Sequence, residues 1–353
     1  MKQIFKVSLF GAVALAVMSL GGAFGLAAPV VPGPPSGNYA AWTLTPEDPI
    51  AQNHTGTIAF GVPGVPNATF AVTKSVDDGE DVELRTSTDV GEWFTNATPF
   101  GSVFGASGPS DTIQVLSTRI DTGSLSSVAT TTYTFAAPVP AGVLGFAFGD
   151  IDLDSLVISG ISGDGSPLTG AQLVGSVFNF CDVTTGAPDD CDGLSAPWPV
   201  PVWDPETRTI SYPTDEDTDG AITWFRPTVS ISSLTFTFEG SDSAGSPSYR
   251  TWFAALSGQV GGTVAVPTGA TATPVTVELL DVGGAVLATA TTDASGVYSF
   301  PPRAALAGYT VRLVTPAGYT VVGGSSKTAD LSAGNVVVDF SLTAESVTPK
   351  FTG

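Results

Sequence analysis

Residues 274–300, PVTVELLDVGGAVLATATTDASGVYSF, decide the fold of the C-terminal part of this chain, together with residues 308–322, GYTVRLVTPAGYTVV. Val275, Val277 and Leu279 alternate with polar residues, which is typical of a strand with one buried face. Both stretches therefore predict β-strands joined by short turns rather than helices.

The turns of this region follow ordinary hairpin chemistry. Residues 281–284 and 293–296 each begin with Asp, which bonds to its own backbone, and end with Gly, which accepts a positive φ. Val286–Thr292 lies between them as a partner strand. The large apolar residues of the following strands share a face: Tyr298, Phe300, Tyr309, Val311 and Leu313. The pattern predicts a small β-sandwich and offers no catalytic chemistry.

Residues 258–344 resemble the SdrD B-like repeat of staphylococcal serine-aspartate-repeat surface proteins and the wider prealbumin-like, or Cna B-type, family. The resemblance is carried by VTVELLD, TTDASGVYSF and AGYTVRLVTPAGY. It implies an Ig-like sandwich that acts as a stalk or spacer. This sequence differs from the family in two places where relatives bind calcium or form an internal crosslink. The opening strand, within 257–270, has no carboxylate for calcium, and Lys327, the one lysine in 258–344, is not on that strand, so no isopeptide crosslink is expected.

The N-terminus has the features of a signal peptide. Lys2 and Lys6 precede an apolar run over 7–20 that is too short to span a bilayer. Small residues follow, so we expect a signal peptide over 1–27 and an exported protein without a later membrane span. A Pro/Gly-rich leader, 28–38, is expected to be extended and mobile.

Composition limits the classes of partner and fold. The 353 residues include 41 Gly and 27 Pro, only 13% are charged, and the net charge is −21. An acidic surface repels phosphates and anionic lipids, so nucleic acid is not expected as a partner. No amphipathic helical pattern follows the signal, and the chain is predicted to be all-β.

Residues 39–257 are predicted to form a larger, jelly-roll-like β-sandwich. Apolar or alternating runs end in Gly, Pro or Asp at the spacing of such folds. Residues 133–155 and 220–238 resemble uncharacterised bacterial extracellular β-sandwich domains. A boundary near 258 is expected, and 345–353 is expected to be a flexible tail without a wall-sorting motif. The protein is then secreted, held non-covalently, or part of a longer chain.

The cysteines and tryptophans of the larger region suggest a disulfide and a ligand-binding surface, respectively. Cys181 and Cys191 are the only cysteines, and in an exported protein such a pair predicts a disulfide. Most tryptophans are expected in the core. Trp198 and Trp203 lie in the Pro-rich stretch APWPVPVWDP and are the candidates for an exposed ligand-binding platform.

Acidic clusters are the candidate metal sites, with calcium as the candidate cofactor. Asp215, Asp217 and Asp219 have the spacing of a calcium loop, but no helix pattern follows, so an EF-hand is excluded. Alternation places a second trio on one strand face, where it must meet solvent, a cation or Arg: Asp150, Asp152 and Asp154. A third cluster, within 77–83, is expected to be an exposed acidic turn. A solvated turn remains the alternative for each.

Catalysis finds little support in the sequence. His54 is the only histidine, in the loop-like stretch QNHTGT, and is expected to be an ordinary loop residue. There is no G-x-S-x-G elbow and no phosphate-binding loop. We therefore expect a non-enzymatic surface or matrix protein with an unknown extracellular protein or glycan ligand. A carbohydrate-binding protein using the loop tryptophans and a polysaccharide-active enzyme on a jelly roll are the alternatives.

Overall fold

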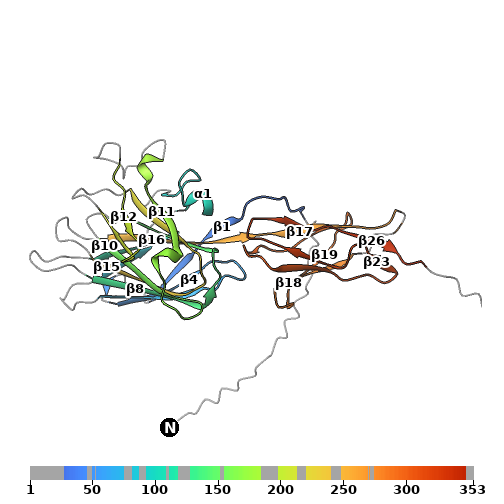
Figure 1. The fold of residues 1–353 in the computed structure, drawn as a ribbon, viewed down its shortest axis with the longest axis horizontal. Helices are drawn as coiled ribbons and strands as arrows, with labels where there is room; N and C mark the ends of the chain where they lie inside the picture. The colour runs from blue at the N-terminus through green and yellow to red at the C-terminus, as the bar shows by residue number, and fades with distance from the viewer. Residues whose placement is uncertain are drawn as a thin grey trace, which may run out of the picture.

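The computed structural model describes residues 28–45, 50–51, 53–74, 82–86, 93–108, 111–117, 128–151, 155–183, 198–212, 220–239, 248–268, 270 and 274–346. Figure 1 shows two β-sandwiches lying end to end. Nearly all regular structure in these residues is β, and the short helix α1 (Gly101–Phe104) lies beside the larger sandwich. The predicted all-β class is therefore confirmed.

The larger sandwich consists of two mainly antiparallel sheets. The nine-stranded sheet has the order β11 (Leu173–Asn179), β14 (Ala221–Pro227), β9 (Leu144–Gly149), β16 (Ser248–Gly258), β7 (Thr112–Ser117), β6 (Val82–Thr86) and β3 (Ile50–Ala51), with β1 (Ser36–Tyr39) and β21 (Arg303–Ala304) also paired to β16. The eight-stranded sheet has the order β12 (Val202–Asp204), β13 (Thr209–Ser211), β10 (Ser155–Ser162), β15 (Ile231–Glu239), β8 (Val128–Val139), β5 (Ala68–Lys74), β4 (Asn53–Ala59) and β2 (Ala41–Thr45). Two 3₁₀ turns flank β11: Gly170–Gln172 and Phe180–Asp182.

The core between these sheets is built from inward-facing aromatic and branched residues. Phe146 is fully buried, and its ring contacts those of Phe225, Phe236 and Phe253 at centroid distances of 5.5–5.8 Å. Such offset and tilted ring pairs are the favourable arrangements for aromatic side chains. The core therefore holds the two sheets in one packing arrangement.

The centre of the nine-stranded sheet is buried on both faces, which adds a third layer to the sandwich there. Every residue of β9 is buried. On its outer face, Trp93, Phe94 and Phe100 pack against Trp252 and further apolar residues of the sheet. Residues 93–108, including α1, provide this cover. An all-apolar strand such as β9 is what burial on two faces requires.

The smaller sandwich has two sheets around its own core. One has the order β20 (Val297–Ser299), β17 (Val260–Ala265), β26 (Phe340–Ala344) and β23 (Tyr319–Val321), with β25 (Val336–Val337) also paired to β17. The other has the order β19 (Val286–Thr291), β18 (Thr276–Leu280), β22 (Tyr309–Leu313) and β24 (Ser326–Ala329). β17 runs parallel to β25 and β26, whereas the other strand pairs in the described part of this sandwich are antiparallel.

The predicted faces and turns of the smaller sandwich are confirmed. Val275, Val277 and Leu279 are buried in its core, as are the five predicted residues of the later strands. Asp293 accepts hydrogen bonds from the N–H groups of Ser295 and Val297 at 2.8 and 2.9 Å. Gly284 and Gly296 have φ values of 84° and 80°, so each turn uses a conformation that glycine adopts without strain. The fold of this sandwich therefore follows from local sequence features, namely the alternation of its strands and the Asp and Gly residues of its turns.

Candidate functional site

The joint between the sandwiches is the first candidate feature. β16 runs from the middle of the nine-stranded sheet to Gly258, and β17 begins two residues later in the smaller sandwich. The C-terminal end of β16 pairs with β1 on one side and with β21, which comes from the smaller sandwich, on the other. Figure 1 shows this shared strand crossing from one sandwich into the other. The two cores are thus linked by paired backbone rather than by a free linker.

Residues 303–306 extend the joint from the smaller sandwich. The Ala304 N–H donates to the Pro63 carbonyl at 3.0 Å, and the Ala305 N–H donates to the Leu256 carbonyl at 2.9 Å. Ala304 belongs to the core of the larger sandwich, and Ala305 belongs to its outer aromatic layer. Buried backbone groups paired in this way are costly to separate. The segment therefore opposes hinge motion.

The leader differs from its expected mobility. It is extended, but Ser36–Tyr39 form β1 against β16, and Gly33 pairs with Asn335 of the smaller sandwich. The Asn335 N–H donates to the Gly33 carbonyl at 2.8 Å, and Val30 is buried. A Cβ added to Gly261 would lie 2.5 Å from Val30, which shows how closely the leader fits. Pro and Gly set its extended path, and tertiary contacts immobilise it.

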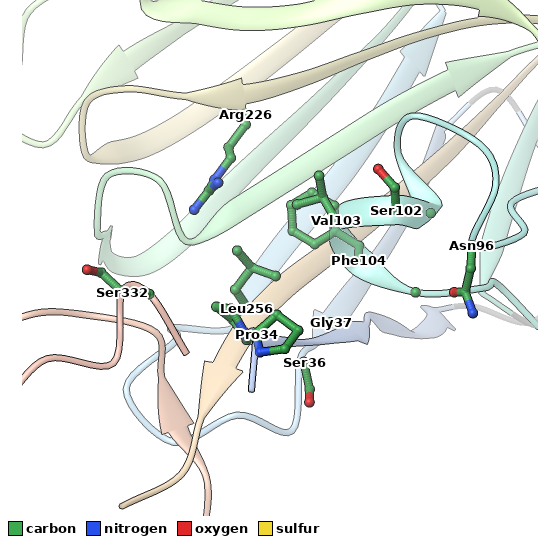
Figure 2. A pocket seen from close by; sticks show the side chains of 14 residues that line it. Pro34, Ser36, Gly37, Asn96, Ser102, Val103, Phe104, Arg226, Leu256 and Ser332 are labelled. Carbon is green, nitrogen blue, oxygen red and sulfur yellow. The ribbon is translucent and has the colours of Figure 1, made fainter. Parts of the chain in front are cut away.

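A pocket of about 570 Å³ lies at the joint, and its lining is drawn in Figure 2. The leader contributes Pro34 and Ser36, and the larger sandwich contributes Val103, Phe104 and Leu256. The lining is completed on one side by the smaller sandwich: Ser332 and Ala333. A Cβ at Gly37 would lie 1.9 Å from the Phe104 carbonyl oxygen, so glycine is required where the leader passes α1. The pocket therefore forms where the leader and the two sandwiches meet.

Arg226 is the cation of this pocket. Its Nε donates to the Gly142 carbonyl at 2.6 Å, and its side chain extends toward the space above Leu256 in Figure 2. Partial burial lowers the pKa of its guanidinium from the usual value. The contact fastens the loop before β9 to β14, so Arg226 has a structural partner in the fold.

Trp198 and Trp203 do not form a common platform. Trp198 packs against the outer aromatic layer that contains Trp93 and Phe180. Trp203, on β12, packs against the core between the two sheets and meets the ring of Phe225 edge to face at 4.6 Å. The nine-stranded sheet separates these two clusters. Trp203 borders a cleft between two sheet edges.

The Trp203 cleft, of about 490 Å³, lies where two sheet edges face each other. β11 is the outermost strand of one sheet and β12 is the outermost strand of the other. Eight residues line it: Gly175, Ser176, Val177, Pro201, Val202, Trp203, Thr223 and Phe225. None of these eight carries a charge, and the cleft volume lies within the ~300–1,000 Å³ range of small-ligand sites.

Asp150 has an arginine partner in the fold. Its carboxylate lies 3.5 Å from Nε of Arg250 and accepts a hydrogen bond from the Ser248 hydroxyl at 2.7 Å. Arg250 also lies over the Trp93 ring, 4.7 Å from its centroid. Pairing with Arg was one of the alternatives that the sequence allowed. Asp150 therefore ties β16 to the end of β9.

The remaining predicted metal ligands lie outside the described residues: Asp152, Asp154, Asp215, Asp217 and Asp219. Within the described part of the chain, no group of three or more His, Cys, Asp or Glu residues gathers. The calcium hypothesis for these clusters stays a prediction. Of the cluster in 77–83, only Val82 and Glu83 are described, in β6.

Cys181 is buried at the edge of the outer aromatic layer, and the described part of the chain has no free cysteine. Its backbone N–H donates to the Asn179 side chain at 3.0 Å. Cys191 lies outside the described residues, so the Cys181–Cys191 disulfide stays a prediction.

His54 differs from its expected loop position. It lies on β4, is buried, and stands opposite Val72 of β5. The sequence NHTGTIA alternates polar and apolar residues, and this pattern outweighs the loop-forming character of its first residues. His54 is therefore a packed strand residue.

Rows of threonine hydroxyls lie on the outside of the eight-stranded sheet. Thr43, Thr57 and Thr69 lie opposite one another on β2, β4 and β5, and Thr134 of β8 continues the row. A second row includes Thr132 and Thr235, whose hydroxyls lie 3.2 Å apart. Sequence reasoning missed this face, although alternating Thr in these strands signals it.

Comparisons with known proteins do not assign a family. No protein-family model matches the chain, and no curated protein matches its sequence. Among solved structures, the chain is similar to the adhesin domain of Epf from Streptococcus pyogenes, at 8% identity and a TM-score of 0.23, over 89% of this chain and 99% of that one.

Two further similarities are equally distant. The Bacillus anthracis TIE protein matches at 9% identity and a TM-score of 0.21, over 86% of this chain and 41% of that one. BcpA, the major pilin subunit of Bacillus cereus, matches at 8% identity and a TM-score of 0.21, over 64% of this chain and 66% of that one. The chain thus spans less than two thirds of either protein. Likeness at this level carries no argument about function.

Proposed function

We propose that this chain is an exported, non-enzymatic surface or extracellular-matrix protein. In it, residues 39–257 present a binding surface and residues 258–344 serve as a structural spacer. The observation that carries the proposal is the joint, in which β16, the leader and residues 303–306 fasten the two sandwiches together. A spacer that holds its neighbour at a fixed angle needs such a joint.

Further features support the proposal. The N-terminal stretch has the pattern of a signal peptide, and the net charge of −21 favours solubility outside the cell. In the described residues, no helix is long and apolar enough to cross a membrane. The smaller sandwich consists of hairpins, an apolar core and tight turns, which suits a spacer.

Surface labelling of intact producing cells tests the proposal. An antibody raised against residues 28–257 should bind intact cells or the culture medium, and N-terminal sequencing should find the mature chain beginning near residue 28. Protein confined to the cytoplasm with residues 1–27 retained would contradict export. Turnover of any polysaccharide, lost on one Asp or Glu substitution, would contradict the non-enzymatic part.

A further inference from the structure

We propose that the pocket at the joint binds a small monocarboxylate through Arg226, with an apolar group of the ligand seated on the wall beside it. The C-terminal residue of a peptide has this combination of groups. The site goes beyond the proposed function, because neither export nor a spacer role requires a ligand there. The inference begins with a guanidinium group that the fold uses only in part.

Arg226 is held by one of its three side-chain nitrogens. Its Nε donates to the Gly142 carbonyl at 2.6 Å, and the Gly142 N–H donates in turn to the Pro227 carbonyl at 2.9 Å. This turn is therefore fixed, and it orients the guanidinium. In the part of the chain that the structure describes, Arg226 makes no further hydrogen bond, and neither Nη atom is completely buried. A ligand in the pocket can reach both Nη groups.

The charge of Arg226 is not neutralised by a neighbouring acid. The sequence has 33 Asp and Glu residues against 12 Lys and Arg, yet among the described residues no carboxylate forms an ion pair with Arg226. Partial burial lowers the pKa of its guanidinium, which means that the cation has lost part of its hydration. A bound anion would offset this cost.

The two Nη groups select a carboxylate as the anion. Arginine presents its N–H groups in a rigid planar fork, and a carboxylate accepts two parallel hydrogen bonds from such a fork. Because Nε is engaged at Gly142, the end of the fork between the two Nη groups of Arg226 remains. One guanidinium balances one negative charge, and the net charge of −21 disfavours polyanions.

The wall beside Arg226 is apolar. Pro34 of the leader, Val103 of α1 and Leu256 of β16 line it. Figure 2 shows the Arg226 side chain above Leu256, with Val103 to one side. Pro34 is exposed and Val103 is partly exposed, so an apolar group on the ligand would remove apolar surface from water. The ligand therefore carries an apolar group close to its carboxylate.

Two serine hydroxyls in the lining serve as acceptors. The Ser102 hydroxyl donates to the Pro99 carbonyl at 2.8 Å, and the Ser332 hydroxyl donates to the Asp330 carboxylate at 2.6 Å. Each hydroxyl has used its proton and keeps lone pairs for a donor from the ligand. The amide N–H of the last residue of a peptide is such a donor. A second carboxylate would find no proton at Ser332 and would be repelled by Asp330.

Ligand-observed NMR titration of the full mature chain with three small probes tests the site. Acetyl-glycyl-leucine has the carboxylate, the apolar group and the amide N–H, and it should bind at millimolar concentration. Its C-terminal amide lacks the charge, and glucuronate has the carboxylate without the apolar group. Each of these two probes should bind at least tenfold more weakly.

Three variants locate the binding. Arg226→Gln should weaken binding of acetyl-glycyl-leucine at least tenfold. Arg208→Gln is the matched control and should bind as the wild type does, because Arg208 also donates its Nε to a carbonyl, that of Ile158 at 3.1 Å, but does not line the pocket. Ala333→Trp fills the pocket from an exposed position without touching the Gly142 contact. It should abolish binding and leave the melting temperature unchanged.

Several outcomes would overturn the proposal. These are no binding of acetyl-glycyl-leucine at millimolar concentration, equal binding of its amide or of glucuronate, and unchanged binding by Ala333→Trp. A loss in Arg208→Gln equal to that in Arg226→Gln would also overturn it, because the effect would then follow overall charge rather than the pocket. Surface labelling of intact cells tests export separately, so the proposed function stands or falls on its own experiment.

Discussion

The two sandwiches solve the same packing problem in different ways. The smaller one has a single core, tight Asp-Gly turns and alternating strands. The larger one has an inner core, a second aromatic layer outside the nine-stranded sheet and an open cleft at its flank. The smaller sandwich therefore depends mainly on local turn chemistry, and the larger sandwich depends on aromatic packing between distant segments. The joint decides whether the two behave as one body.

The largest effect is expected from core truncation in each sandwich. Phe146→Ala and Phe340→Ala each remove a buried ring and should lower the free energy of unfolding by ~3–5 kcal/mol. β16 of the larger sandwich pairs with β1 of the leader and with β21 from the smaller sandwich, so the two sandwiches should unfold together. Both variants should therefore shift one common transition in calorimetry. Two transitions, each moved by only one of the variants, would show that the sandwiches unfold independently.

The second prediction concerns the leader. Gly37→Ala forces a methyl group against the Phe104 carbonyl and should destabilise the chain by ~1–3 kcal/mol, as measured by urea unfolding. The matched control is Gly33→Ala, whose added Cβ has no neighbour closer than 4.0 Å. That control should leave stability unchanged or slightly raised. Equal effects of the two variants would show that the leader is not held against α1.

High pH should weaken the folded chain through its buried tyrosines. Burial raises the pKa of Tyr39, Tyr133 and Tyr249 in the larger sandwich, and of Tyr298 and Tyr309 in the smaller one. The folded state then keeps protons that the unfolded chain loses near pH 10. Stability is full below that pH and falls as pH rises above it.

Melting temperatures measured from pH 8 to pH 11.5 check this prediction. Tyr249→Phe, which also loses the 2.7 Å hydrogen bond with Thr131, should start from a lower melting temperature but decline less steeply above pH 10. A wild-type melting temperature that stays flat to pH 11.5 would contradict the burial of these hydroxyls.

The smallest effect is expected at the turns of the smaller sandwich. Asp293→Ala removes the acceptor for two backbone N–H groups and should cost ~1 kcal/mol in the free energy of unfolding. Glu278→Gln weakens the 2.6 Å ion pair with the half-exposed Arg312 and should cost less, ~0–1 kcal/mol. A larger loss at Glu278 than at Asp293 would mean that side-chain pairs rather than turn geometry hold this sheet.

The smaller sandwich could be predicted almost residue by residue because its signals are local. Alternation at Val275–Leu279 and the Asp-Gly turns act within a few positions of the chain. The outer aromatic layer could not be predicted in the same way. It needs Trp93 and Phe100 to cover Trp252, more than 150 residues away, and the only signal was the uninterrupted apolar run of β9.

The candidate site residues show the same contrast between local signals and long-range contacts. The Pro-rich stretch singled out Trp198 and Trp203 as a pair, but their separation depends on the sheet that lies between them. The mobile leader was expected from composition alone, and its pairing with Asn335 depends on a contact across about 300 residues. His54 was wrongly predicted to lie in a loop, because the stretch His-Thr-Gly is compatible with both a loop and a strand near the sheet edge. Long-range contacts decided each case.

The central claim is that the joint fixes the two sandwiches in one orientation. Spin labels at exposed Glu206→Cys and Thr328→Cys, one on each sandwich, report the distance between them by pulsed electron resonance, with each single variant as the labelling control. A single narrow distance distribution, broadened when residues 28–37 are removed, is the predicted result. A broad distribution in the intact chain, unchanged by that removal, would contradict the account.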